Sequence, residues 1–294
     1  MIKINDFNTQ HISCEYADSV IKMERHFKMG NRYLSYILNE RNFRDDIVLC
    51  PPSKLIKVIE SFNLRFPDID HDAEDWRYFR NYMIRPYERV RKGILHLVLN
   101  SLNLSVCPYC NRQYIFGTDN NRKVGAQFDH FYSKSKYPYL ALSFYNLIPC
   151  CPTCNKAKGE ECIEINPYIE GFENNGKLMV DSPLNCILRN ADWEVKFKAD
   201  DRCKTNIQAF ALDELYKKHK DYAHEIVLKS VAYQKGYYND LKISFRNIGI
   251  TDETIERILW GNYLDNSQLS RRPLSKMTLD IINQFLNLDD CDDI

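Results

Sequence analysis

Two Cys-x-x-Cys motifs about 40 residues apart constrain this chain more than any other feature. Cys107 and Cys110 stand in Cys-Pro-Tyr-Cys, and Cys151 and Cys154 stand in Cys-Pro-Thr-Cys, both of which are turn-forming knuckle sequences. Four thiolates with this spacing complete the tetrahedral ligand set of one structural Zn²⁺. We therefore predict a zinc site that clamps the base of the intervening segment, in preference to four ordinary buried cysteines. Cys150 adjoins the second pair and is interpreted as a non-ligand, because Cys151 and Cys154 have the required spacing.

Composition limits the class of protein. The chain has 294 residues, which suggests about two domains or one core with large flanks. Its 11 cysteines are an odd number in a chain longer than most secreted disulfide scaffolds, so we expect a reducing, cytoplasmic location. No apolar leader or membrane-spanning stretch is recognisable, and we expect no membrane association. Because the net charge is zero, any contact with nucleic acid requires a local basic patch.

The regions on either side of the cysteine pairs have mainly helical periodicity. Residues 1–106 are predicted as a helical N-terminal region, with apolar faces around Tyr33 and around Trp76. Residues 161–294 are predicted as a mixed and then helical C-terminal region, in which one helix begins near Thr251. The expected fold class is α+β, with mainly helical flanks around a central finger at residues 107–160.

Within the finger, short strand-like runs replace the helical pattern. The strand candidates are Gln113–Phe116, Lys123–His130 and Asn146–Pro149, and the polar turn Gly117–Asn121 would join the first two. A helix is expected to begin near Pro152, since Pro suits a first helical turn.

Chemically competent side chains are concentrated in this segment. Asp129 offers oxygen atoms to a hard cation such as Mg²⁺ or Mn²⁺, and the neighbouring His130 can take a proton from an attacking water. Asn155 and Lys158 lie three residues apart and share a helix face. We expect Asn155 to offer its side-chain carbonyl to the metal and Lys158 to offer its charge to a phosphate.

These residues together carry a resemblance to a known family. The run from Cys107-Pro-Tyr-Cys110 through Asp129-His130 and Asn146 to Cys154-Asn155 resembles the HNH endonucleases, whose site is a ββα-metal finger. His130, Asn146 and Asn155 fall on the three family positions, which makes this an H-N-N variant. The resemblance implies that His130 is the general base, that Asp129 and Asn155 hold a catalytic Mg²⁺ or Mn²⁺, and that Asn146 braces the loop around His130.

The sequence of residues 129–138 also resembles that of HNH nucleases from bacterial anti-phage systems of the Septu and retron type, which often carry Pro at the position of Ser133. This likeness implies a defence effector that cuts nucleic acid, with DNA favoured and RNA as the alternative. The chain has no Walker-type loop, so nucleotide-driven control would come from a partner ATPase or another regulatory protein.

Basic residues within the segment support a nucleic-acid substrate. Residues 101–160 carry seven Lys or Arg against three Asp or Glu, a local net charge of +4. Backbone phosphates bind such patches. The predicted nucleic-acid contacts are Lys158, Lys156, Lys134, Lys136 and Arg112.

A second basic stretch, Arg77–Lys92, has interleaved aromatic residues and could also follow a phosphate backbone. We favour the simpler interpretation for it, a helix with its aromatics packed inward and its arginines in water.

Two alternatives to a nuclease stay open at the level of sequence. The first is a non-catalytic, zinc-stabilised module that binds nucleic acid or protein. The second is a helical adaptor that retains an inactive finger. The presence of Asp129, His130 and Asn155 together favours the enzyme.

Overall fold

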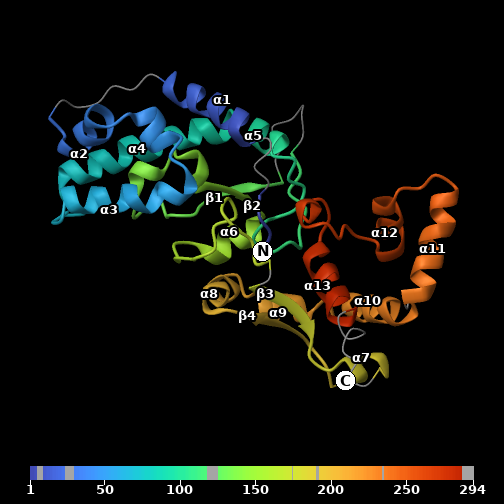
Figure 1. Cartoon of the computed structure of the whole chain (residues 1–294). Coiled ribbons are helices and arrows are strands. Elements are labelled where there is room, and N and C mark those ends of the chain that lie inside the picture. Colours follow the sequence, from blue (N-terminus) through green and yellow to red (C-terminus); the bar gives the residue numbers. More distant parts are fainter. Residues whose placement is uncertain are drawn as a thin grey trace.

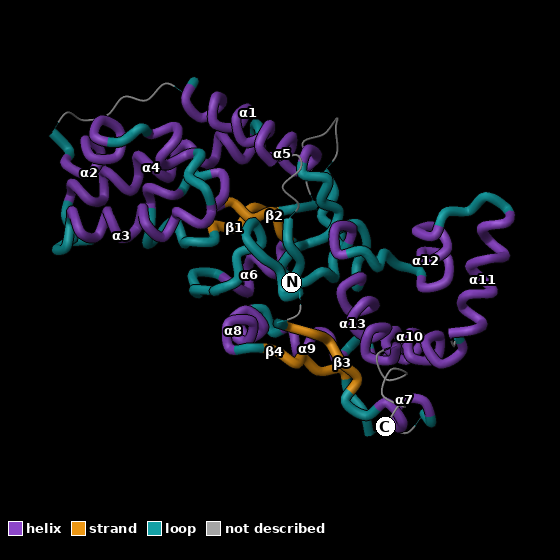
Figure 2. Tube along the Cα trace, viewed as in Figure 1, coloured by secondary structure: helices purple, strands orange, loops and turns teal. Residues whose placement is uncertain are grey.

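The structure is a computed structural model that describes residues 1–4, 9–23, 30–117, 125–173, 175–189, 192–233 and 235–286. Helices make up both flanks, and the finger lies between them (Figure 1). Within the described residues the strands form two small antiparallel pairs, β1–β2 and β3–β4, which Figure 2 shows as short orange segments. The predicted α+β class is therefore confirmed.

The N-terminal flank is a group of helices with its own aromatic core. Its α-helices are α1 (Thr9–Ile21), α2 (Arg32–Ser35), α3 (Leu55–Arg65), α4 (Glu74–Lys92) and α5 (Leu95–Ser101), and two π-helical segments cover Tyr36–Glu40 and Phe43–Val48. Tyr33, Trp76 and Phe79 are buried together, as the apolar periodicity predicted. Tyr139 and Leu140 from the finger complete this cluster, so the finger is anchored in the N-terminal helices.

The finger contains a hairpin and a short helix. Strands β1 (Gln127–His130) and β2 (Leu147–Cys150) pair in antiparallel register, with Asp129 opposite Ile148 and His130 opposite Leu147. Helix α6 (Pro152–Lys158) follows β2 directly and has Pro152 in its first turn, as predicted. The predicted strand Asn146–Pro149 is thus displaced by one residue. Predicted strand Lys123–His130 is observed from Gln127, and residues 123 and 124 lie outside the described residues.

The predicted strand at Gln113–Phe116 is wrong. Only Tyr114 forms a single bridge, to Val106, and the proposed partner turn Gly117–Asn121 lies mostly outside the described residues. The cause is the first cysteine pair, which closes a tight turn here. The Cys107 amide donates to the Gln113 carbonyl, and the Asn111 amide donates to the Cys107 carbonyl. The Cys107–Gln113 bond and the bond from the Ile115 amide to the Ser105 carbonyl are the two ladder bonds of the Val106–Tyr114 bridge, and the pairing ends at this single bridge where the cysteine turn begins.

The C-terminal flank supports the finger from the other side. Its elements are β3 (Gly176–Val180), α7 (Pro183–Ile187), β4 (Val195–Ala199), α8 (Asp201–Ala209), α9 (Leu212–Lys217), α10 (Lys220–Ala232), α11 (Lys235–Asn247), α12 (Asp252–Trp260) and α13 (Ser275–Leu286). The hydroxyl of Tyr216 donates to the Cys110 carbonyl at 2.7 Å, and the Asn111 side chain bonds the backbone of Leu269 and Lys276. Thr251 caps α12, as predicted.

The main buried core runs through all three regions expected from the sequence. It includes Tyr16 of α1, Tyr109 and Phe128 of the finger, and Ile226 and Ile281 of the C-terminal helices. The finger is therefore packed on both sides by helices. None of the helices among the described residues is long and apolar enough to cross a membrane.

Candidate active site

The four predicted zinc ligands meet at one point. The Sγ atoms of Cys107, Cys110, Cys151 and Cys154 all lie within 4.8 Å of one another, and all four residues are buried. Cys110 Sγ and Cys151 Sγ are 3.9 Å apart. Zn–S bonds of about 2.3 Å in a tetrahedron place sulfur atoms about 3.8 Å apart, so the donor set fits a structural Zn²⁺. Cys150 lies outside this group, as predicted.

The second cysteine pair also starts and orients helix α6. Cys151 is its N-cap, and its Sγ accepts a hydrogen bond from the Cys154 amide. The helix ends after Lys158 because Gly159 has φ +52°, a conformation that glycine adopts without strain. Asn155 and Lys158 both lie on the side of this short helix that meets the β1–β2 hairpin, in agreement with their predicted shared face.

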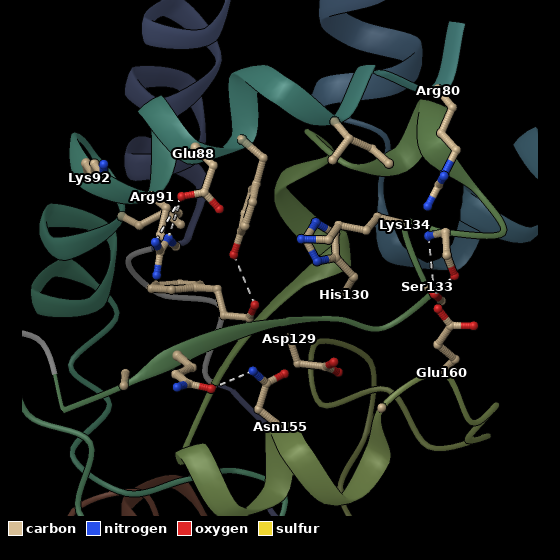
Figure 3. A pocket seen from close by; sticks show the side chains of 18 of the residues that line it. Arg80, Glu88, Arg91, Lys92, Asp129, His130, Ser133, Lys134, Asn155 and Glu160 are labelled. Carbon is tan, nitrogen blue, oxygen red and sulfur yellow. Dashed lines mark hydrogen bonds and ion pairs between the residues drawn. The ribbon is translucent and has the colours of Figure 1, made fainter. Parts of the chain in front are cut away.

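His130 occupies the end of β1 and is 7% exposed. Its Nε2 lies 3.1 Å from the Ala141 carbonyl oxygen, which can only accept, so Nε2 carries the proton and Nδ1 has the free lone pair. Burial, followed by the charge of Lys134, lowers the pKa of His130 to about 3. The ring is therefore neutral at pH 7. Figure 3 shows His130 on the side of the strand that faces α4.

Asp129 points to the opposite face of the strand and is held by two partners. Its carboxylate accepts a hydrogen bond from the Tyr109 hydroxyl at 2.7 Å and pairs with the Lys158 ammonium at 3.2 Å. Burial raises the pKa of Asp129, and the Lys158 charge partly offsets that effect. Tyr109, between the first two cysteines of the cluster, was not identified from the sequence. Only its position inside the Cys-Pro-Tyr-Cys knuckle could have indicated it.

The position of Lys158 contradicts its predicted role as a phosphate contact. It is 1% exposed, and its ammonium donates to the His130 carbonyl at 2.9 Å as well as pairing with Asp129. An ammonium enclosed in this way cannot reach a substrate phosphate. The reason is the packing of α6 on β1, which turns the helix face that carries Lys158 toward the hairpin.

Asn146 lies in the loop that connects the two strands and is fully buried. Its Nδ2 donates to the carbonyls of Tyr132 and Leu140, both at 3.0 Å, and its Oδ1 accepts from the Tyr132 amide at 2.7 Å. All of these bonds join backbone groups of the loop that follows His130. This geometry supports the bracing role implied by the family resemblance and involves no contact with the cavity.

Asn155 is partly exposed, and its Oδ1 accepts no hydrogen bond from the residues that the structure describes. Its Nδ2 donates to Gln127 Oε1 at 2.6 Å, which leaves Oδ1 directed toward Asp129 in Figure 3. Asp129, His130 and Asn155 all line one cavity of about 930 Å³. The structure thus brings together the three residues on which the predicted chemistry depends.

Helix α4 forms the opposite wall of this cavity. Its Arg80, Glu88, Arg91 and Lys92 line the cavity together with the finger residues, as Figure 3 shows. The Tyr87 hydroxyl donates to the Phe128 carbonyl at 3.1 Å and ties the helix to β1. The interpretation favoured for Arg77–Lys92, a helix with its aromatics packed inward and its arginines in water, was incomplete. Its aromatics do pack inward, but several of its cations face the site instead of bulk water alone.

The other predicted phosphate contacts have different surroundings. Lys134 lines the cavity and lies over the Tyr87 ring at 4.7 Å, and Lys136 lines a neighbouring cavity. Lys156 is exposed on α6 but does not line either cavity. Arg112 donates to His219 at 2.9 Å and also lies outside both cavities. Lys134 and Lys136 are thus the predicted cations best placed to meet a substrate.

Comparison with known proteins agrees with this geometry. The family model of the HNH endonucleases matches residues 107–161. The Septu protein PtuB of Bacillus thuringiensis is 28% identical to this chain over 113 residues, which cover 37% of this chain and 40% of that protein. No solved structure matches the chain. The resemblance to HNH endonucleases, with likeness to a Septu protein, is therefore confirmed for this part of the chain.

Proposed function

From the HNH endonuclease match at residues 107–161, we propose that this chain is a metal-dependent endonuclease that hydrolyses phosphodiester bonds of nucleic acid. DNA is the favoured substrate and RNA the alternative. One observation carries the proposal, namely that Asp129, His130 and Asn155 line a single cavity whose opposite wall is cationic. Substrate phosphates need such cations for affinity.

The protonation state of His130 suits a general base. The imidazole is neutral, its Nε2–H is committed to the Ala141 carbonyl, and Nδ1 retains a lone pair. Nδ1 would take the proton of the attacking water as the water's oxygen bonds to phosphorus and the bond from phosphorus to the leaving sugar oxygen breaks. The Ala141 carbonyl holds the ring in the correct tautomer. Asn146 acts on this step indirectly, because it fixes the loop that contains Ala141.

Asp129 and Asn155 would hold the catalytic cation. A carboxylate and an amide oxygen are hard donors that suit Mg²⁺ or Mn²⁺, and a carboxylate can coordinate a metal while it accepts other hydrogen bonds. When bound, the cation supplies charge stabilisation for the phosphate and for the leaving oxygen. The Lys158 ammonium beside Asp129 repels a metal cation that binds to the same carboxylate. We therefore expect weak, millimolar-range affinity for the cation.

The same ion pair is the specific observation that favours the non-catalytic alternative. If Lys158 permanently satisfied Asp129, the finger would be a zinc-stabilised binding module. Nicking of supercoiled plasmid with and without Mg²⁺ or Mn²⁺ separates the two functions. We expect metal-dependent nicking, and we expect His130→Ala to reduce its rate by about 10²–10⁴-fold with zinc retained.

Variants at Asn155 test the metal assignment separately. Asn155→Ala should raise the Mn²⁺ concentration needed for half-maximal nicking. Asn155→His should retain part of the activity, because histidine, like asparagine, offers an atom that can coordinate the metal. Lack of nicking by the wild-type protein in every metal would sink the nuclease proposal. Equal nicking rates for wild type and His130→Ala, prepared in parallel, would indicate a contaminating nuclease and would also refute the nuclease proposal.

The likeness to a Septu protein supports a role in anti-phage defence, with a partner ATPase or another regulatory protein. In a phage-plating assay, wild-type protein expressed with its neighbouring genes should reduce plaque formation, and the His130→Ala variant should not. Equal protection by both would exclude cleavage as the defensive step.

A further inference from the structure

A second cavity of about 580 Å³ adjoins the candidate active site. Arg80, Ser135 and Glu160 line both cavities, so the two are neighbours that share one boundary. The volume is in the range of roughly 300–1,000 Å³ that is typical of small-molecule sites. A group bound here would lie next to a phosphate bound in the first cavity.

The walls of the second cavity are rich in aromatic side chains. They include the partly exposed Phe66 and Tyr137 and the buried Trp76 and Tyr139. Phe62 stacks on Tyr139 with ring centroids 4.1 Å apart, which fixes the Tyr139 ring from behind. Rigid aromatic walls of this kind favour a flat, apolar-faced ligand.

One polar atom in this wall has no partner. The Tyr139 hydroxyl is buried, the residue is 1% exposed, and within the described parts of the chain the oxygen forms no hydrogen bond. Leaving a buried hydroxyl unpaired is unfavourable, and such groups are rare in native proteins. The oxygen is itself enclosed by its neighbours, so Tyr139 presents its ring, and not its hydroxyl, to the cavity.

Charges at the boundary indicate what is attached to that ligand. Arg80 and the exposed Lys136 are cationic, and Glu160 is the acidic residue among the lining side chains. His71 also contributes to the rim and stands edge-on to Trp76. The aromatic interior suits a neutral planar group, and the two cations suit a phosphate beside it.

We propose that this second cavity binds an unpaired nucleobase of the substrate, adjacent to the phosphate that is cleaved. The inference rests on the proposed nuclease function and specifies its substrate class. Bases in a duplex are stacked and paired, so their faces are not available to aromatic walls. The preferred substrate is therefore single-stranded, or contains an unpaired nucleotide at the cut.

Binding measurements test this without any need for cleavage. Fluorescence anisotropy, with no added Mg²⁺ or Mn²⁺, compares labelled single-stranded DNA, RNA of the same sequence and the corresponding DNA duplex. We expect at least one of the single strands to bind more tightly than the duplex. Tyr137→Ala should weaken single-strand binding by roughly 5–150-fold, the usual effect of losing one stacking ring, with little change for the duplex.

Tyr139→Phe keeps the ring and removes the lone hydroxyl. It should fold normally and bind single strands like wild type, because the hydroxyl is enclosed and only the ring faces the cavity. Tyr237→Ala, which removes an exposed tyrosine on the distant helix α11, is the matched control and should bind like wild type.

The outcomes separate this inference from the proposed function. Equal affinity for single strands and duplex, or unchanged single-strand binding by folded Tyr137→Ala, would overturn the base-binding cavity even if plasmid is nicked. Failure to nick plasmid or single strands in any metal would instead remove the nuclease, whatever the binding results.

Discussion

Replacement of Lys158 by Met tests the most unexpected contact in the site. Met keeps much of the side-chain volume and removes the ammonium that pairs with Asp129 at 3.2 Å and donates to the His130 carbonyl at 2.9 Å. The Lys158 side chain is fully buried and that of Asp129 is 4% exposed, so water cannot replace the lost partner. Removing one member of a buried ion pair costs about 3–5 kcal/mol.

A second estimate, from the cost of protonating Asp129, gives a similar loss of stability. If Asp129 became neutral to escape the unpaired state, the cost at pH 7 would be about 4 kcal/mol, because pH 7 lies about three units above the ordinary Asp pKa and each unit is worth about 1.4 kcal/mol. The Tyr109 hydroxyl, which would remain bonded to the carboxylate, reduces the loss. We therefore expect Lys158→Met to lower the free energy of unfolding by about 3–4 kcal/mol.

The loss should depend on pH in a defined direction. Burial already raises the pKa of Asp129 in the folded protein, and removal of Lys158 raises it further. A carboxyl group with a raised folded pKa favours folding when protonated, and this contribution disappears as pH rises through the folded pKa. The destabilisation by Lys158→Met should therefore be larger at pH 8 than at pH 6.

Urea unfolding followed by circular dichroism, with zinc saturating, measures the effect. Lys156→Met, on the exposed face of the same helix, is the control and should change stability by no more than about 0.5 kcal/mol. The double variant Asp129→Asn with Lys158→Met removes both charges and should recover part of the loss. If Lys158→Met were as stable as Lys156→Met and instead weakened nucleic-acid binding with a reduced salt slope, the phosphate role predicted from sequence would be restored.

Two further results are expected. Elemental analysis should find about one zinc per chain, which millimolar Mg²⁺ does not displace. Cys154→Ser should lose the zinc and unfold the finger, whereas Cys150→Ala should retain the zinc. A protein that is active without zinc would contradict the predicted zinc site. Asn146→Ala should lower both melting temperature and nicking rate, because the partly buried amide and carbonyl of Tyr132 lose their Asn146 partner at about 1–3 kcal/mol each. The Leu140 carbonyl keeps its bond from the Ser143 amide. An unchanged melting temperature would refute the bracing role.

Local sequence signals predicted the parts of the site that depend on local chemistry. Cysteine spacing identified the four cysteines that gather into a cluster able to hold a metal ion, and the Pro152 signal located the start of α6. The order Asp129-His130 followed by Asn155 identified three side chains that do line one cavity. The cysteine and proline signals lie within a few residues of the groups they predict, whereas Asp129 and His130 were grouped with the distant Asn155 by the family resemblance.

The errors within the site concern contacts between residues far apart in the chain. Lys158 and Asp129 are separated by 29 residues, and helical spacing alone showed that Lys158 shares a face with Asn155 but not that this face packs on β1. Tyr109 reaches Asp129 across 20 residues for the same reason. Partners of this kind are set by tertiary packing, which periodicity does not encode.

The helical N-terminal region is part of the site and not a separate attachment to it. The family match begins at residue 107, but the cavity wall opposite His130 is made by Arg80, Glu88 and Arg91 of α4. The loop after His130 is also held from this side, because Tyr139 and Leu140 are buried in the N-terminal core. Residues 107–161 therefore carry the proposed metal ligands and the proposed base, and α4 forms the cavity wall opposite them. Substrate choice in this chain should accordingly be determined by residues outside the matched segment as much as by those within it.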